Sequence, residues 1–180
     1  MKISITVIVV LTAIVIAAAT TMLKHDMPVT QDSATSSATM SAAVAGRPDC
    51  PSGVDLPCLG GKVVDTPAKP MVINVWAWWC QPCRKELPFV EQLAESRPDL
   101  TVVGVHEDTN AANGAAFLKD LGIGLPSYQD ATGAFAAKYQ LPSVVPVTVV
   151  LRADGSVAAT LTQAFDSYAA FSAAVNSALE

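Results

Sequence analysis

Positively charged residues are few in this chain, and they do not cluster. Its 180 residues include 11 Lys and Arg against 16 Asp and Glu, which gives a formal net charge of −5. The range 47–180 alone holds 9 basic and 14 acidic residues and has the same net charge. A nucleic-acid-binding protein needs a basic patch or stripe to contact phosphates. The sequence therefore predicts no nucleic-acid partner.

Charges are missing altogether from Ile3–Leu23, which lies between Lys2 and Lys24. An apolar helix of about 20 residues can span a bilayer. We expect an uncleaved single-pass membrane anchor that leaves the rest of the chain outside the cytoplasm. The alternative is a cleaved secretory signal with alanines 17–19 at the cleavage site. Both alternatives export the remaining chain, and the absence of a cysteine at this boundary argues against a lipoprotein.

The segment after the charge-free run is rich in Ser, Thr and Ala and has no hydrophobic periodicity. Such a segment cannot bury a core and is typical of a flexible linker. His25 would be a solvated residue of this linker. We therefore expect three parts: residues 1–24 as anchor or signal, residues 25–46 as linker, and residues 47–180 as a folded domain.

The most informative stretch is Val72–Pro88, which reads VINVWAWWCQPCRKELP. Its apolar start predicts a buried strand, and its charged end predicts a helix. Cys80 and Cys83 lie between them as a C-x-x-C pair, which is a redox signature in that context. The unpaired N–H groups and the dipole at the start of a helix stabilise a thiolate at Cys80. Cys83, one turn further on, could resolve a mixed disulfide.

A second pair of cysteines, Cys50 and Cys58, lies in the Pro- and Gly-rich range Arg47–Lys62. An oxidising compartment favours a structural disulfide between them. Closing so short a loop would contribute at most about 2–3 kcal/mol. A second redox pair, free thiols and intermolecular bonds remain alternatives, since four cysteines allow three pairings.

The motif N-V-W-A-x-W-C-x-P-C-R-x-E-L-P, from Asn74 to Pro88, resembles the thioredoxin superfamily, and within it the membrane-anchored TlpA/ResA/DsbE branch. The resemblance extends over roughly Leu56–Glu180. Asn74 stands where thioredoxin itself has a buried acid, and Glu86 matches an acid of the ResA-like branch. The resemblance implies a thioredoxin fold, which is a three-layer α/β/α arrangement around a mixed sheet.

The resemblance also implies the parts of an active site. Cys80 would be the attacking thiol and Cys83 the resolving thiol. Glu86 would either handle protons for this pair or be an ordinary acid on the helix surface, while Asn74 would form local hydrogen bonds. Pro146 is expected to follow a cis peptide bond, so that the main chain of Val145 can pair with a substrate strand. The residues expected to contact substrate are Trp79, Gln81, Pro82, Val145 and Pro146.

The remaining pattern predicts alternating strands and helices, with Trp76 in the core. The predicted strands and extended segments are 71–77, 100–106, 125–128, 147–152 and 157–161, with a further strand or hairpin in 59–65. The predicted helices are 80–96 with a kink at Pro88, 110–121, 132–139, and a C-terminal helix capped by Asp166.

These features predict an exported, membrane-anchored thiol–disulfide oxidoreductase that needs neither an organic cofactor nor a metal. By resemblance, its substrates would be the haem-attachment disulfides of apocytochrome c, and its electron donor a CcdA/DsbD-like membrane protein. The runner-up is an exported disulfide oxidase or isomerase that acts in oxidative protein folding.

Two functions of other classes fit the sequence less well. A Sco-like copper chaperone has a C-x-x-x-C spacing and a distant histidine, whereas this chain has C-x-x-C. Only His106 is available in the domain, and we expect it to be solvated at the end of a strand. A peroxidase of the superfamily usually has a threonine three residues before the cysteine, and Ala77 stands there.

Overall fold

The computed structural model describes Val44 and residues 46–180. The expected anchor, Ile3–Leu23, and most of the expected linker lie outside these residues. In the part of the chain that is described, no helix has the length and apolarity required to cross a bilayer. Val44 falls in the range expected to be linker, yet its side chain is buried with the core of the domain.

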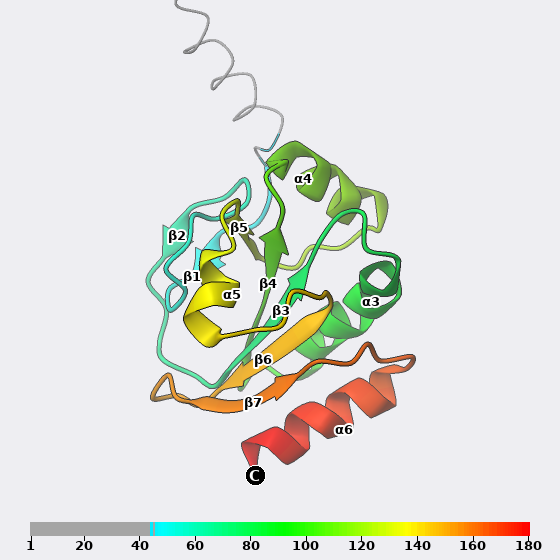
Figure 1. The fold of residues 1–180 in the computed structure, drawn as a ribbon. Helices are drawn as coiled ribbons and strands as arrows, with labels where there is room; N and C mark the ends of the chain where they lie inside the picture. The colour runs from blue at the N-terminus through cyan, green and yellow to red at the C-terminus, as the bar shows by residue number, and fades with distance from the viewer. Residues whose placement is uncertain (1–43, 45) are drawn as a thin grey trace, which may run out of the picture. The chain divides into compact units, whose positions relative to one another are not determined.

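A five-stranded mixed sheet with the order β5-β4-β3-β6-β7 forms the centre of the domain (Figure 1). Its strands are β3 (Met71–Trp76), β4 (Thr101–Glu107), β5 (Ser127–Asp130), β6 (Val147–Leu151) and β7 (Val157–Leu161). Strand β3 pairs in parallel with β4 and antiparallel with β6. All six residues of β3 are buried, which explains why its sequence is an almost continuous apolar run.

Helices cover both faces of the sheet and complete three layers (Figure 1). Helices α3 (Gln81–Ser96), α4 (Ala111–Asp120) and α6 (Tyr168–Leu179) contribute to the core on one face, together with Val72 and Trp76 of β3. Helix α5 (Ala134–Tyr139) contributes Phe135 to the core on the other face, with Ile73 and Val75. The expected three-layer α/β/α arrangement with a mixed sheet is confirmed.

Helix starts follow from the side chains that precede them. Asn110 accepts a hydrogen bond from the Asn113 N–H at 3.0 Å and caps α4. Helix α6 is capped by Ser167, whose hydroxyl accepts from the Ala170 N–H at 3.3 Å. The prediction of Asp166 as this cap was wrong by one residue, because the helix begins at Tyr168 and the cap is the residue directly before it.

The N-terminal part of the domain has a short strand inside the range 59–65, as predicted, but no hairpin there. Strands β1 (Cys50–Pro51) and β2 (Val63–Val64) pair in parallel as a separate small sheet, and a parallel pair cannot be joined by a tight hairpin turn. A disulfide joins Cys50 and Cys58 with an S–S distance of 2.01 Å.

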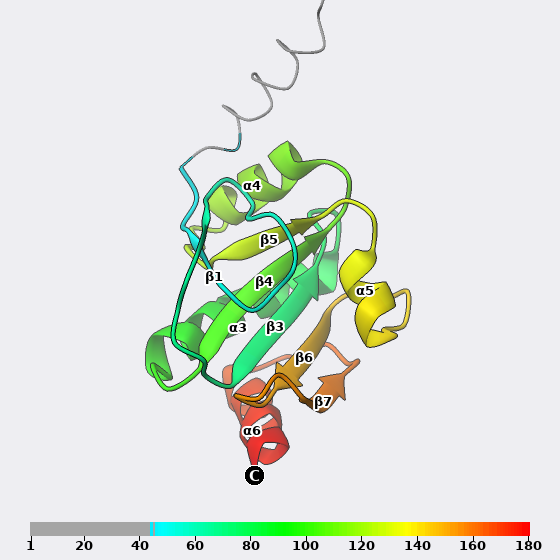
Figure 2. The same ribbon diagram turned by 90° about the vertical axis from the view of Figure 1, so that its left-hand side faces the viewer.

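The segment closed by this disulfide lies along the outer edge of β5 (Figure 2). The Leu59 N–H donates to the Ser127 carbonyl at 2.8 Å, and the Gln129 N–H donates to the Pro57 carbonyl at 2.8 Å. The segment therefore satisfies main-chain groups that an edge strand would otherwise leave open.

Strand β5 itself lies two residues later than the extended segment predicted at 125–128. Pro126 precedes it and has no N–H to donate, but its carbonyl accepts from the Gly104 N–H at 2.9 Å. After β5, the Asp130 carboxylate accepts from the N–H groups of Ala134 at 3.0 Å and Phe135 at 2.8 Å. Asp130 thereby fixes the start of α5.

Candidate redox site

The C-x-x-C pair lies where β3 ends and α3 begins. Cys80 and Cys83 form a disulfide with a Cα–Cα distance of 5.3 Å. Cys80 is the N-cap of α3, and its sulfur accepts from the Cys83 N–H at 3.1 Å. Cys80 is 4% exposed and Cys83 is fully buried, so a partner protein can reach only the Cys80 sulfur directly. The same N–H groups at the helix start would stabilise a Cys80 thiolate after reduction.

The loop before β6 lies next to the Cys80 sulfur. The Val145 carbonyl oxygen is 3.6 Å from Cys80 Sγ. The Val145–Pro146 peptide bond is cis, Pro146 is buried and Val145 is half-buried. Val144, directly before them, has 54% of its surface exposed. A main-chain carbonyl and an apolar surface thus flank the one sulfur of the Cys80–Cys83 pair that a partner can reach.

Aromatic side chains form the other side of this surface. Trp79 is 55% exposed, and its indole N–H donates to Asp108 Oδ2 at 3.0 Å. Gln81 and Pro82 are also exposed at the start of α3. Trp76 is fully buried, which confirms its expected place in the core.

A shallow hollow of about 460 Å³ extends from this aromatic surface towards α4. Trp78, Trp79 and Gln81 line the side next to Cys80. On the far side the Arg84 guanidinium lies 4.5 Å above the centre of the Phe117 ring, which is a cation–π contact. The hollow next to the cysteines therefore has aromatic side chains beside Cys80, and one cation, Arg84, and one acid, Asp120, on its far side.

Glu86 is fully buried, so the alternative of an acid on the helix surface was wrong. Its Oε1 accepts from Asn74 Nδ2 at 2.8 Å, and its Oε2 accepts from the Phe165 N–H at 2.7 Å. Burial raises the pKa of Glu86, although the bonds from Phe165 and Asn74 oppose this rise. The only ion pair within the described residues is Arg97–Asp99, so no cation balances Glu86.

The sequence predicts only local hydrogen bonds for Asn74 and gives no role to Thr148. Asn74 bonds across the domain rather than locally: it reaches Glu86 on α3, and its Nδ2 also donates to Thr148 Oγ1 at 2.9 Å. The two residues face each other in the β3–β6 ladder. Each is the one polar residue of an otherwise apolar strand. A single polar residue in each of two buried strands is a sequence pattern that indicates such a pair.

A model of the AhpC/TSA family matches residues 60–160. The chain belongs to the AhpC/TSA family. Over 134 residues it is 26% identical to the thiol-disulfide oxidoreductase ResA of Bacillus subtilis, and the match covers 68% of this chain and 73% of ResA. Over 88 residues it is 32% identical to the soluble secreted antigen MPT53 of Mycobacterium tuberculosis, which is 49% of this chain. The chain spans about half the length of that curated relative.

Solved structures share the fold of this AhpC/TSA family member. A secreted disulfide oxidoreductase of Mycobacterium tuberculosis, described as homologous to E. coli DsbE, is 28% identical with a TM-score of 0.59. The similarity covers 68% of this chain and 93% of that one. A DsbF homologue from Corynebacterium diphtheriae is 32% identical with a TM-score of 0.53, over 61% and 72% of the two chains. The fold is therefore thioredoxin-like.

In this AhpC/TSA family member His106 is not solvated, and that prediction was wrong. Strand β4 continues past it to Glu107, and the ring is fully buried, 4.6 Å from the centre of the Trp76 ring. His106 Nδ1 bonds to Gln129 Oε1 at 2.9 Å, and burial lowers the pKa of the imidazole. Among the residues with a described placement, no three His, Cys, Asp or Glu side chains gather as a metal site requires.

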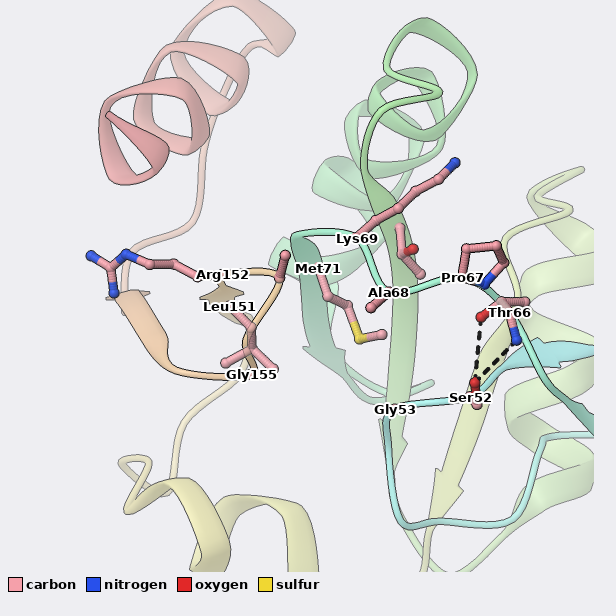
Figure 3. A pocket seen from close by; sticks show the side chains of 12 residues that line it. Ser52, Gly53, Thr66, Pro67, Ala68, Lys69, Met71, Leu151, Arg152 and Gly155 are labelled. Carbon is pink, nitrogen blue, oxygen red and sulfur yellow. Dashed lines mark hydrogen bonds between the residues drawn. The ribbon is translucent and has the colours of Figure 1, made fainter.

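A second pocket of about 160 Å³ lies at the opposite end of the sheet (Figure 3). Met71, at the start of β3, lies in it, whereas Cys80 follows the other end of that strand. Its two cations bond elsewhere: Lys69 Nζ donates to the Pro98 carbonyl at 2.7 Å, and Arg152 donates to the Val157 carbonyl at 3.0 Å. Figure 3 shows both side chains extending away from Met71.

Proposed function

We propose that this chain is an exported thiol–disulfide oxidoreductase that acts on the disulfides and dithiols of other proteins. The observation that carries this proposal is the Cys80–Cys83 disulfide at the N-terminus of α3, with one sulfur reachable and the other buried. Relatives named thiol-disulfide oxidoreductase ResA and thiol:disulfide interchange protein DsbE support it. Ala77, three residues before Cys80, offers no hydroxyl of the kind expected in a peroxidase.

The exchange needs no other redox group. In the reducing direction the Cys80 thiolate attacks a substrate disulfide, forms a mixed disulfide and releases one substrate thiolate. Cys83 then attacks Cys80 Sγ as a thiolate, which breaks the mixed disulfide and releases the second substrate thiolate. The two electrons of the dithiol pass to the substrate, whose thiolates take up two protons. The dithiol of another protein restores the reduced state by the same exchange in reverse.

Glu86 acts in the second of these steps. It lies three residues after Cys83, on the same face of α3, and both side chains are fully buried. We assign to its carboxylate the proton that leaves the Cys83 thiol as that sulfur attacks. A buried carboxyl with a raised pKa is suited to hold that proton and to return it when the disulfide is next reduced.

The substrate surface surrounds the Cys80 sulfur. We assign side-chain contacts to Trp79, Gln81 and Pro82, which are exposed beside it. The main chain of Val145, before Pro146, is assigned the pairing with an extended substrate segment. Main-chain pairing supplies affinity with little demand on substrate sequence.

For the physiological role we propose the reduction of haem-attachment disulfides of apocytochrome c, with a CcdA/DsbD-like membrane protein as electron donor. The similarity to ResA and DsbE supports this assignment. We further propose that Ile3–Leu23 anchors the chain in the membrane, that residues 25–46 form a linker, and that the domain of residues 47–180 faces away from the cytoplasm. A linker of this length would let the anchored domain reach a reductase in the same membrane.

The reduction potential of the Cys80–Cys83 pair in the full-length protein tests the direction of electron flow. A potential near the thioredoxin value of about −270 mV supports delivery of electrons to apocytochromes. A potential near the DsbA value of about −120 mV would refute it and favour oxidative protein folding. The Cys50–Cys58 disulfide is followed separately by mass in the same samples.

Exchange with an oxidised peptide that contains C-x-x-C-H tests the roles of the two cysteines. Cys80→Ser should abolish the exchange, and Cys83→Ser should accumulate the mixed disulfide on Cys80. The variant with Cys50→Ala and Cys58→Ala is the matched control and should retain the exchange. Full activity of Cys80→Ser would refute the proposed function.

A further inference from the structure

Both groups that hydrogen-bond to Glu86 are donors. Its two oxygens accept from Asn74 Nδ2 at 2.8 Å and from the Phe165 N–H at 2.7 Å. Asn74 Nδ2 also donates to Thr148 Oγ1 at 2.9 Å. The other atom of the same amide, Asn74 Oδ1, is buried and accepts no hydrogen bond from any described residue. Two donors and no acceptor match an ionised carboxylate.

A neutral Glu86 needs a different set of partners. Its O–H must find an acceptor, since buried polar groups without a partner are costly. The Phe165 N–H belongs to the main chain and can only donate. The Asn74 amide can change role, because half a turn about its terminal bond exchanges Nδ2 and Oδ1. Asn74 Oδ1 would then accept from Glu86, and the Thr148 hydroxyl can follow because it donates as well as accepts.

We propose that Asn74 is a positioning residue whose side-chain amide turns over whenever Glu86 gains or loses the proton exchanged with Cys83. The proposal rests on the proposed function, which gives Glu86 that proton. One orientation of the amide holds the carboxylate with two donors, and the other holds the neutral acid with a donor and an acceptor. Glu86 thereby keeps a hydrogen-bond partner at Asn74 in both of its forms. An acidic residue in place of Asn74 would instead repel the carboxylate.

Other charges around Glu86 have little part in its titration. Strands β3, β6 and β7 and helix α6 contain no Asp, Glu, Lys or Arg. The titratable groups of nearby elements are exposed or bonded elsewhere. Arg84, Lys85 and Glu95 of α3 and Asp166 before α6 are exposed, and Glu91 of α3 accepts from the Gly124 N–H. His106 lies against Trp76, Glu107 lies near Asp130, and Tyr168 bonds to Ser96. Burial, the Phe165 N–H and the Asn74 amide, in that order, set the pKa of Glu86.

NMR of the unaltered full-length protein tests the coupling. The Glu86 carboxyl carbon and the Asn74 side-chain amide are followed together from about pH 4 to pH 9. Both bonds donated by Asn74 Nδ2 break when the amide turns, so its signals should shift with the same midpoint as the Glu86 carbon. The side-chain amide of Asn113 on α4 is the internal control and should not follow. Asn74 signals that stay fixed while Glu86 titrates would overturn the proposal.

Variants supply a second, independent measurement. Asn74→Leu has a similar size but removes both the donor and the acceptor. Asn74 bonds more strongly to the charged carboxylate than to the neutral acid. Loss of both bonds therefore disfavours the carboxylate, and the Glu86 midpoint should rise by about one pH unit. Thr148→Val leaves the Asn74–Glu86 bond in place and should leave the midpoint unchanged, as should Thr101→Val, the matched exchange at a distant strand end. An unchanged or lowered midpoint in Asn74→Leu contradicts the proposal, and if that variant does not fold, the measurement on the unaltered protein still decides.

Exchange kinetics separate this inference from the proposed function. If Glu86→Gln resolves the mixed disulfide at the normal rate over the same pH range, the proton exchange with Cys83 is refuted, whatever the Asn74 amide does. If Glu86→Gln slows that step while the Asn74 signals stay fixed, the function of Glu86 stands and the turnover of the amide is refuted.

Discussion

Replacing both Cys50 and Cys58 by alanine should destabilise the domain without touching the Cys80–Cys83 pair. The two residues are eight positions apart in the sequence and are joined by a disulfide. The segment that this bond closes, through Pro57, and Leu59 directly after it each form one main-chain hydrogen bond with the outer edge of β5. Loss of the bond therefore frees the unfolded chain and also weakens the cover of an edge strand.

The magnitude follows from the length of the closed loop. Loop-closure entropy for a loop of this size is worth about 2.5 kcal/mol at 25 °C. Cys50 is also fully buried, and the loss of its sulfur from the core adds about 1 kcal/mol. We expect the free energy of unfolding to fall by about 3.5 kcal/mol.

Urea unfolding of the oxidised protein measures this loss, and hydrogen exchange locates it. The Gln129 N–H, which donates to Pro57, should exchange faster in the variant, while the amides of β3 keep their relative protection. The variant with Cys80→Ala and Cys83→Ala is the control, since it removes the other disulfide and leaves β5 covered. A loss of stability below about 1 kcal/mol, or unchanged exchange at Gln129, would refute the reasoning.

Three further predictions concern single residues. Glu86→Gln should become more stable relative to the unaltered protein as pH rises. Burial raises the pKa of Glu86, so the stability that the unaltered protein has below the unfolded-state pKa is lost as pH rises through the folded-state pKa. A difference in urea-derived stability that stays constant with pH would contradict this. Gly114→Ala should destabilise by about 1–2 kcal/mol in thermal unfolding, although alanine favours helix, because its Cβ would lie 2.6 Å from the His106 ring; an equal or higher melting temperature would contradict this. Asp130→Asn should cost about 1–2 kcal/mol at pH 7. Burial would raise the pKa of Asp130, but bonds from the N–H groups of Phe135 and its neighbours outweigh burial and lower it, so the cost should vanish as pH falls through the folded pKa; a cost that persists in acid contradicts this.

The sequence predicts the central strand and the first long helix to within a residue because two strong signals coincide there. An apolar run buried on both faces leads into a charged segment with a periodic apolar stripe, and Cys80 lies at the junction. The same reasoning places α4, whose cap at Asn110 and stop near Gly122 are both local signals. Local chemistry is sufficient for these elements.

Contacts between distant elements are where the sequence falls short. Glu86 lies on the buried stripe that begins with Cys83, but a charged residue in a helix is ordinarily assigned to its surface. The predicted strand 100–106 ends one residue before β4 does, so His106 is expected at a solvated strand end and not in the core. The bonds from Asn74 and Phe165 that hold Glu86 depend on strand register and on the path of the chain before α6, which no local pattern specifies.

The atom that faces the Cys80 sulfur belongs to the main chain of Val145. A carbonyl oxygen is present whichever side chain occupies that position, so substitution at Val145 cannot delete it. Sequence change in this loop can therefore alter which partners bind well while the exchange chemistry continues. Side chains at this position can therefore change, in evolution or by engineering, without loss of the carbonyl. Variant libraries at Val144 and Val145 should yield proteins with altered substrate preference more often than inactive proteins.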